Sequence, residues 1–445
     1  MRVLWAKAGK LLPVRNGGNI RSYHLLRQLA LRHEVTVFSY YGEARDVAYE
    51  EALAEQFSGA VCLCTGASET PGWRRNLDYL LRLPAKAPYA VSRFSCEAVR
   101  RRLGQWYDAR TYDVAVCDFL DAAVNFPARL AIPTVLFQHN VESEIWRRHA
   151  QMEGNKIRQF IYRMEFGKMR RYESECLRRF AHVIAVSEHD RGLMRAWVGE
   201  SGVSVVPTGV DLQNFRCDPS VSAAEPLVVF VGAMDWEPNV DAVGYFSREI
   251  WPAVRAKVPA ARLRIVGRNP DLRIQRLASD SVHVTGEVAS VVDHLRGAAV
   301  VVVPLRVGGG TRLKIYEAMA MGKAVVSTTV GAEGLDVHHG HDLLLADTPA
   351  AFATAVVALL QDRDLRRRYE QAAAALASQH DWAVVCRKFT EILAAVASGR
   401  HPAGGTQPLP GSGKNDEQTM QPSPADQPGE PMLSLTEPQA GEGRV

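Results

Sequence analysis

Three glycines followed by two cations form the segment whose residue types are best suited to chemistry. Residues 308–310 are all glycine, and Arg312 and Lys314 follow in the first turn of a predicted helix. Cations at the positive end of a helix dipole cost up to about 1 kcal/mol each, and a bound anion reverses that sign. Glycines also let a diphosphate reach free backbone N–H groups. The segment therefore predicts a phosphate-binding site; the alternative is an ordinary glycine turn beside two solvated cations.

The predicted helix has Thr311 as its N-cap and Gly322 as its terminator, which makes it about ten residues long. Glu317 lies too far along this helix to touch the same phosphates. If its side chain faces a cleft, the carboxylate can accept two hydrogen bonds from the hydroxyls of a ribose or another sugar ring. The alternative is a solvated glutamate on the helix surface.

His139 is a second candidate for chemistry. It stands between Gln138 and Asn140 in a polar cluster at the carboxyl end of a predicted strand. Ligands of open α/β sheets collect at that edge of the sheet. A lone histidine after a strand is also commonly a structural or surface residue, so both interpretations stay open on the residues alone.

The elements that must position these residues alternate between short β-rich runs and longer helical patterns. Runs such as 300–303 are apolar without alternation, which is typical of strands covered on both faces. This alternation predicts parallel sheets built from βαβ units and arranged as two doubly wound α/β domains. The predicted strands are 3–6, 35–40, 113–118, 134–139, 182–187, 227–233, 262–267, 282–286, 300–305, 324–328 and 343–347.

The chain divides at changes in composition. We predict an N-terminal domain over 1–205, a Pro- and Gly-rich linker over 206–226 and a C-terminal domain over 227–380. A last helical pattern covers 381–398. The remaining 399–445 are rich in Pro and Gly and cannot bury enough apolar surface to offset the entropy of ordering, so we predict a disordered tail.

Bulk composition narrows the classes of function. Lys and Arg total 53 against 49 Asp and Glu, which gives a net charge of +4 and disfavours a nucleic-acid-binding coat. No apolar run approaches the ~20 residues of a spanning helix, and the N-terminus lacks the pattern of a secretory signal. The seven cysteines are scattered, and no metal-ligand pattern is completed. We therefore expect a cytoplasmic protein with reduced thiols and no bound metal.

Two basic segments, 73–103 and 144–180, carry aromatic residues among their cations. One interpretation is solvated helix faces over a core. The other is a surface that meets anionic lipid headgroups at the inner face of the membrane, or a polyanionic acceptor.

The run 304–335, PLRVGGGTRLKIYEAMAMGKAVVSTTVGAEGL, resembles the donor-site signature of retaining glycosyltransferases of the group 1 (family 4) kind. VVPTGVDLQNF, FVGAMDWEPNVDAVGYF, RLRIVGRNP and VTGEV fall in that family's order, and GGNIRSYHLLRQLALRHEVTVFS and TVLFQHNVESEIWRRH add weaker matches in the first half. The resemblance covers most of residues 1–398. A softer resemblance links GGNIRSYHLLRQLA to sugar transferases of exopolysaccharide systems.

The resemblance implies the GT-B fold, in which two Rossmann-like domains face each other across a cleft. The C-terminal domain would hold a nucleoside diphosphate sugar, the N-terminal domain the acceptor, and 381–398 would cross back to the N-terminal domain. Glu317 matches the family's ribose-binding glutamate, and His139 matches its histidine near the transferred sugar. Gly17 and Gly18 match its glycine loop near the diphosphate. Such enzymes typically need neither a metal nor a cofactor beyond the donor.

This sequence departs from the family pattern at two places. Gly309 stands where a glutamate normally reads the hydroxyls of the donor sugar. After Gly232, at the end of the first C-terminal strand, the usual Arg and Lys that grip the diphosphate are absent. The leaving diphosphate still needs positive charge, and we infer that it comes from cations beyond other strand ends: Arg268, Arg306, Arg312 and Lys314.

The sequence thus predicts a retaining, metal-independent glycosyltransferase that acts on a glycan, a lipid-linked or a small-molecule acceptor in cell-surface or exopolysaccharide synthesis. The donor diphosphate would be held by Arg312, Lys314 and the backbone amides of Gly309, Gly310, Thr311, Arg312 and Leu313. Two alternatives remain: a nucleotide-sugar 2-epimerase on the same fold, and a non-catalytic protein that binds sugar nucleotides. A dehydrogenase is disfavoured because no compact GxGxxG follows the first strand.

Overall fold

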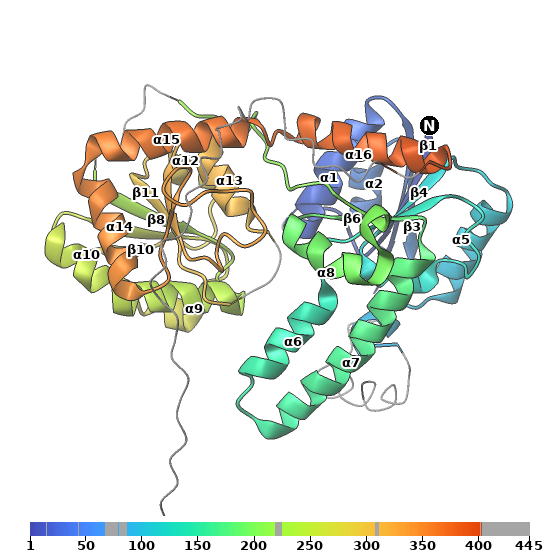
Figure 1. Ribbon diagram of the computed structural model, residues 1–445, viewed down its shortest axis with the longest axis horizontal. Coiled ribbons are helices and arrows are strands. Elements are labelled where there is room, and N and C mark those ends of the chain that lie inside the picture. Colours follow the sequence, from blue (N-terminus) through green and yellow to red (C-terminus); the bar gives the residue numbers. More distant parts are fainter. Residues whose placement is uncertain are drawn as a thin grey trace, which may run out of the picture. The chain divides into compact units, whose positions relative to one another are not determined.

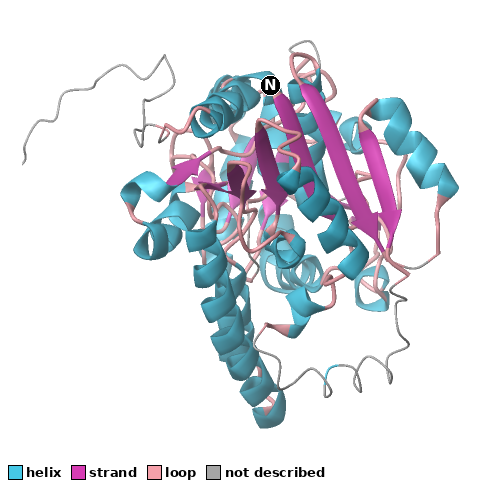
Figure 2. Cartoon of the chain, turned by 90° about the vertical axis from the view of Figure 1, so that its right-hand side faces the viewer, coloured by secondary structure: helices cyan, strands magenta, loops and turns pink. Residues whose placement is uncertain are grey.

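The computed structural model describes residues 1–14, 16–42, 44–66, 79, 87–218, 225–307, 311–400 and 402. Within these residues the chain forms two parallel β-sheets, each flanked by helices (Figures 1 and 2). Every strand pairing is parallel, as the βαβ pattern predicted. Of the predicted disordered tail, 399–445, residues 401 and 403–445 lie outside the described part of the chain.

The first sheet has seven strands in the order β3-β2-β1-β4-β5-β6-β7. The order reverses between β1 and β4, which makes their carboxyl ends the topological switch point. The strands are β1 (Arg2–Ala8), β2 (Glu34–Tyr41), β3 (Ala60–Cys64), β4 (Val114–Asp118), β5 (Thr134–Phe137), β6 (His182–Ala185) and β7 (Val203–Val205). The sequence analysis missed β3 and β7, the two short edge strands.

The second sheet has six strands in the order β10-β9-β8-β11-β12-β13, with its switch point between β8 and β11. The strands are β8 (Leu227–Val231), β9 (Arg262–Val266), β10 (Val282–Val284), β11 (Val300–Val303), β12 (Ala324–Ser327) and β13 (Leu344–Leu345). All six were predicted. The four valines of β11 are buried, because helices cover both faces of this sheet.

Helices follow most strands. Those of the first half are α1 (Gly17–Ala30), α2 (Val47–Gln56), α4 (Tyr89–Ser92), α5 (Glu97–Asp108), η1 (Leu120–Asn125), α6 (Glu142–Met152), α7 (Lys156–Arg179), α8 (Glu188–Val198) and η2 (Glu200–Gly202). Those of the second half are α9 (Glu237–Tyr245), η3 (Phe246–Ile250), α10 (Trp251–Lys257), α11 (Leu272–Gln275), α12 (Val291–Arg296), α13 (Leu313–Ala320), α14 (Pro349–Gln361), α15 (Arg363–Ser378) and α16 (Trp382–Ala397).

The last helix, α16, packs on the first sheet although it follows the second in the chain (Figure 1). Phe389 of α16 lies against Trp5 of β1 and Phe137 of β5, with ring centroids 5.6 and 5.3 Å apart. Leu313, the first residue of α13, belongs to the same hydrophobic cluster. Side chains from late in the chain therefore complete the core of the first sheet.

No helix among the described residues is long and apolar enough to cross a membrane.

Candidate functional site

The N-terminus of α1 lies beside His139. Asn16 caps the helix, because its side chain accepts a hydrogen bond from the backbone N–H of Asn19 at 2.8 Å. Gly17 and Gly18 form the first turn. A Cβ atom placed on Gly18 would stand 3.6 Å from Nδ1 of His139, at van der Waals contact. The predicted glycine loop and the predicted histidine are therefore neighbours at the switch point of the first sheet.

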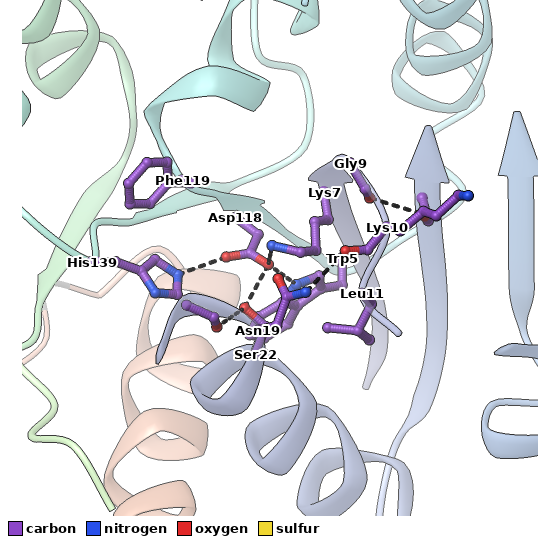
Figure 3. Close-up of polar contacts among 12 residues, drawn as sticks. Trp5, Lys7, Gly9, Lys10, Leu11, Asn19, Ser22, Asp118, Phe119 and His139 are labelled. Carbon is purple, nitrogen blue, oxygen red and sulfur yellow. Dashed lines mark hydrogen bonds and ion pairs between the residues drawn. The ribbon is translucent and has the colours of Figure 1, made fainter. Parts of the chain in front are cut away.

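Asp118, the last residue of β4, is the centre of a buried polar cluster (Figure 3). Its carboxylate accepts hydrogen bonds from Nε1 of Trp5 at 3.0 Å, Oγ of Ser22 at 2.7 Å and Nε2 of His139 at 2.8 Å. Nζ of Lys7 lies 3.4 Å from the same carboxylate. Four elements, β1, α1, β4 and the loop after β5, thus meet at one carboxylate.

The charges in this cluster fix the state of His139. Burial alone would raise the pKa of Asp118, but Lys7 and the hydrogen bond from His139 hold it well below its usual range. Burial lowers the pKa of His139 although Asp118 opposes the shift. A neutral imidazole that donates its Nε2–H to Asp118 carries a lone pair on Nδ1. That Nδ1 is buried and has no hydrogen-bond partner among the described residues, so it can accept a hydrogen bond from a ligand hydroxyl.

Glu173 of α7 holds the loop that carries His139. Its carboxylate accepts hydrogen bonds from Nε2 of Gln138 at 3.1 Å, from the backbone N–H groups of Glu142 and Ser143 at 2.8 and 3.0 Å, and from Oγ of Ser143 at 2.6 Å. Val141, the N-cap residue of α6, supplies no side-chain cap. Glu173 therefore caps α6 from a neighbouring helix and fixes the chain on both sides of His139.

The loop after β11 leads into α13. Gly309 and Gly310 lie outside the described residues. The prediction that Thr311 caps α13 is wrong: the N-cap is Arg312, and no side chain caps this helix end. The hydroxyl of Thr311 instead contacts Arg21 and Thr208. The helix is shorter than predicted, and Gly322 follows it with φ of +65°, as expected of a terminator.

Arg21 of α1 joins the two halves of the site. Its Nε donates to Oγ1 of Thr208 at 2.5 Å, and its Nη2 donates to the backbone oxygen of Thr311 at 3.3 Å. Burial lowers the pKa of Arg21 to about 10, and burial also lowers the pKa of Arg312 to about 10, so both side chains remain cationic at neutral pH. A Cβ atom on Gly17 would stand 3.5 Å from Cδ1 of Leu313. The N-termini of α1 and α13 therefore lie together with buried positive charge.

Lys314 reaches the loop after β8. Its Nζ donates to Oδ1 of Asn239 at 2.9 Å and lies 4.5 Å from the ring centre of Phe230. A Cβ atom on Gly232 would come within 2.9 Å of this Nζ and 2.7 Å of Nδ2 of Asn239, so a larger residue there would displace one or both of these side chains. Burial, followed by the nearby charge of Arg312, lowers the pKa of Lys314 to about 7. Positive charge thus reaches the end of β8 from α13.

Glu317 lies one helical step beyond Lys314, at the i,i+3 spacing that places both side chains on one face of α13. It is partly buried. Burial raises the pKa of Glu317 to about 7, and Lys314 counteracts the shift. The interpretation of Glu317 as a solvated surface residue does not fit this burial.

The other two predicted cations differ from each other. Arg306 donates from Nε and Nη2 to the carboxylate of Asp241, at 3.1 and 2.5 Å, and lies over the ring of Tyr245, so its charge is already paired with a carboxylate. Arg268 follows Gly267, whose backbone lies against the backbone of Gly232. Its Nε is buried without a hydrogen-bond partner among the described residues. Arg268 therefore remains available at the end of β9.

A pocket adjoins this site. It lies between α6, α8 and the loop after β12, and Arg148 and Glu333 form a two-point ion pair across it at 2.9 and 2.7 Å. The lining residues are Asn140, Val141, Glu144, Ile145, Arg148, Ser187, His189, Asp190, Leu193, Thr311, Glu333 and Gly334. No group of three or more potential metal ligands occurs in the described part of the chain.

Sequence reasoning placed the glycine loop, His139 and α13 in the site but missed three residues. Lys7, Arg21 and Asp118 are buried charged side chains at or near the ends of β1 and β4 and in α1. Asp118 carried a usable signal, because it ends the strand beside the one that His139 follows. Arg21 carried none, because its partner Thr311 is remote in sequence.

The two parallel α/β domains and their shared site define the GT-B class of glycosyltransferase folds. Sucrose-phosphate synthase of Thermosynechococcus elongatus has the same fold, with a TM-score of 0.64 at 16% identity over 90% of this chain and 100% of that chain. HepE of Anabaena, solved with UDP and glucose, has a TM-score of 0.62 at 17% identity over 89% of this chain and 100% of that chain.

The model for glycosyltransferase family 4 matches residues 15–214, and the model for glycosyl transferases group 1 matches residues 225–362. The chain belongs to the group 1, family 4 glycosyltransferases. The phosphatidyl-myo-inositol mannosyltransferase of Mycobacterium leprae is 29% identical over 48% of this chain and 59% of that protein. The protein of that name in Mycolicibacterium smegmatis is 27% identical over 56% of this chain and 64% of that protein. The match thus spans less than two thirds of either relative.

Proposed function

We propose that this protein is a retaining glycosyltransferase that moves a sugar from a nucleoside diphosphate sugar to an acceptor hydroxyl. The observation that carries the proposal is the meeting of two helix N-termini, those of α1 and α13, with two buried cations, Arg21 and Arg312, and the half-buried Lys314. Backbone N–H groups and cations at one point suit a diphosphate.

The donor fits the site as follows. Arg312, Lys314 and the amides of residues 311–313 hold the diphosphate, with Gly232 giving Lys314 room to reach it. Glu317 accepts hydrogen bonds from the ribose hydroxyls. Nδ1 of His139 accepts a hydrogen bond from a hydroxyl of the donor sugar, and Gly17 and Gly18 let the α1 N-terminus approach the phosphates. Arg268 adds charge from the end of β9.

In the reaction, the bond between the sugar C1 and the diphosphate oxygen breaks and a bond from C1 to the acceptor oxygen forms on the same face of the sugar. The acceptor proton passes to the leaving phosphate oxygen, so no protein base is required. The cations stabilise the charge that develops on the leaving diphosphate, which is the step where fixed positive charge lowers the barrier. The reaction needs no metal, so the transferase activity of the protein should persist in the presence of EDTA.

The acceptor is a glycan or a lipid-linked sugar of cell-surface or exopolysaccharide synthesis. The mannosyltransferase relatives and the UDP-bound neighbour suggest GDP-mannose and UDP-glucose as the first donors to test.

The test is a screen of these two donors and their ADP and dTDP counterparts by thermal shift, followed by transfer assays with extracted lipid-linked and soluble glycan acceptors. We expect a donor that raises the melting temperature and a product whose anomeric configuration, read by NMR, matches the donor. Release of an epimerised free sugar would identify an epimerase instead. Donor binding with no turnover on any acceptor would identify a binding protein.

A further inference from the structure

Helices α6 and α7 form a pair (Figure 1). Helix α7 carries a cationic face that the proposed reaction does not use. Exposed residues of α7 recur at spacings of three and four, so they lie along one side of the helix. We define the α7 outer face as the residues Lys156, Phe160, Arg163, Gly167, Arg170, Arg171 and Arg178, all of which are exposed. The opposite side of α7 buries Glu165, Met169, Glu173, Cys176 and Leu177.

The charge on this face is not compensated by neighbouring acids. Helix α7 holds eight Lys or Arg residues and three Glu residues. Glu165 and Glu173 are buried, which leaves Glu175 as the exposed acid of this helix. Lys156, Arg163, Arg170 and Arg171 have no ion-pair partner in the described part of the chain; solvent or an external anion must neutralise them.

Exposed apolar side chains lie at the start of α7, with Phe160 on the α7 outer face and Ile157 beside it. Ile157 is 74% exposed and Phe160 is 69% exposed, within the first turns of α7. Large apolar side chains in water are unfavourable, and two of them beside each other next to uncompensated cations are a feature of interaction surfaces. Of the second basic segment, 73–103, residues 73–78 and 80–86 lie outside the described part of the chain, and the segment does not enter the argument.

We propose that the α7 outer face is a docking surface for an anionic lipid membrane. Its cations would meet the negative headgroups, and Ile157 and Phe160 would insert at the boundary between headgroups and acyl chains. A polyanionic glycan could satisfy the cations but would leave Ile157 and Phe160 in water. The combination of charge with apolar side chains therefore favours a membrane over a soluble polyanion.

Docking of this face would bring the pocket to the membrane. The start of α6, the other arm of the helix pair, lines the pocket with Glu144, Ile145 and Arg148. From Arg148 to the end of α6 at Met152 is about 6 Å at the rise of an α-helix. A membrane-held acceptor headgroup could therefore reach the pocket. This last step rests on the proposed function, whereas docking itself does not.

The test is sedimentation of the full chain, without any donor, with vesicles of equimolar phosphatidylglycerol and phosphatidylcholine or of phosphatidylcholine alone. We expect binding to the anionic vesicles, weaker binding as salt rises, and little binding to the neutral ones. A triple variant, Arg163→Gln, Arg170→Gln and Arg171→Gln, should bind about 100-fold more weakly, since each cation contributes about fivefold. The double variant Ile157→Ser and Phe160→Ser should also lose binding.

Matched controls keep the net charge and the apolar loss equal but place them elsewhere. Arg276→Gln, Arg367→Gln and Arg368→Gln remove three exposed cations of the second domain. Leu31→Ser with Leu272→Ser removes two apolar side chains that are 75% and 66% exposed. These controls should bind like the wild type. The proposal is overturned if the wild type does not bind anionic vesicles, or if the control and α7 variants bind them equally. It is also overturned if the protein binds heparin and the Ile157 and Phe160 substitutions leave that binding unchanged. The last result would assign the face to a glycan.

Discussion

Nε2 of His139 lies 2.8 Å from Oδ1 of Asp118, and this hydrogen bond determines which nitrogen of the imidazole faces the ligand. The ionised carboxylate accepts the hydrogen bond from the protonated Nε2. The unprotonated Nδ1, with its lone pair, then lies beside the first turn of α1. Asp118 is thus a positioning residue for His139 as well as the partner of Lys7.

We predict that Asp118→Asn destabilises the protein by about 3–5 kcal/mol, because it leaves the buried Lys7 without its counter-charge. Chemical denaturation measures this directly. The NMR signals of the His139 ring should also show a mixed tautomer, which a purely structural role would not produce. Asp113→Asn is the matched control. The Asp113 carboxylate forms a solvent-exposed ion pair with Arg2, so the substitution should lower the free energy of unfolding by at most about 1 kcal/mol. Equal losses for the two variants would contradict the prediction.

The ion pair of Asp118 with Lys7 also predicts how the stability of the protein depends on pH. The pKa of Asp118 is depressed in the folded protein, so its contribution is present above the unfolded value of about 3.9 and is lost as pH falls through the folded value. The difference in stability between wild type and Asp118→Asn should therefore be constant at neutral pH and shrink below about pH 4. A difference that already shrinks near pH 6 would show that another group is responsible.

Lys314 predicts the pH dependence of donor binding. Its pKa is about 7 in the free protein, and a bound diphosphate would raise it. Binding then takes up a proton above about pH 7, so the affinity for UDP should fall as pH rises, by at most tenfold per pH unit. Calorimetry of the wild type and of Lys314→Met checks this. Lys314→Met should bind UDP more weakly, and its affinity should not fall as pH rises. An unchanged pH dependence would show that a group other than Lys314 titrates on binding.

Gly232 predicts a steric effect on the same lysine. In Gly232→Ala the new Cβ would collide with Nζ of Lys314 and with Asn239, so Lys314 must move. We expect UDP affinity to fall about tenfold or more, as for a lost charge-assisted hydrogen bond. Gly104→Ala, in the middle of α5 with no atom near its Cβ, is the control and should stabilise the protein by about 0.5–1 kcal/mol. Wild-type affinity in Gly232→Ala would contradict the role of Lys314.

Glu317 predicts selectivity for the ribose. The wild type should bind UDP about 10- to 100-fold more tightly than its 2′,3′-dideoxy analogue, because the carboxylate would lose its hydroxyl partners. Glu317→Ala should bind the two nucleotides almost equally, whereas Glu391→Ala, at an exposed site on α16, should behave like the wild type. Retained discrimination in Glu317→Ala would remove this residue from the ribose site.

The fold was largely predictable because each buried parallel strand leaves an apolar run in the sequence. Residues 300–303 show this clearly. The carboxyl ends of such strands meet at one edge of the sheet, which is why His139 was expected among the ligand-binding residues. The glycine loop was expected there from the family resemblance. The edge strands β3 and β7 escaped prediction. β3 is only partly buried, and β7 has three residues, so neither leaves a long apolar run.

The polar connections of the site were not predictable, because they join residues far apart in sequence. Thr311 has the residue type of an N-cap, but Arg21 competes for its hydroxyl from the other domain. Lys314 has the position of a first-turn phosphate ligand, but its reach to Gly232 depends on the packing of α13 against β8. The local sequence pattern identifies such residues, but it does not determine which residue, distant in sequence, each of them contacts.

The packing of α16 on the first sheet also bears on how the chain is made. Trp5 belongs to the first strand to leave the ribosome, and its neighbour Phe389 belongs to the last helix. The first sheet can form its strands early, yet the part of its face that α16 covers stays exposed until synthesis has passed residue 397. The N-terminal domain, although translated first, is therefore completed only after the second domain has been synthesised.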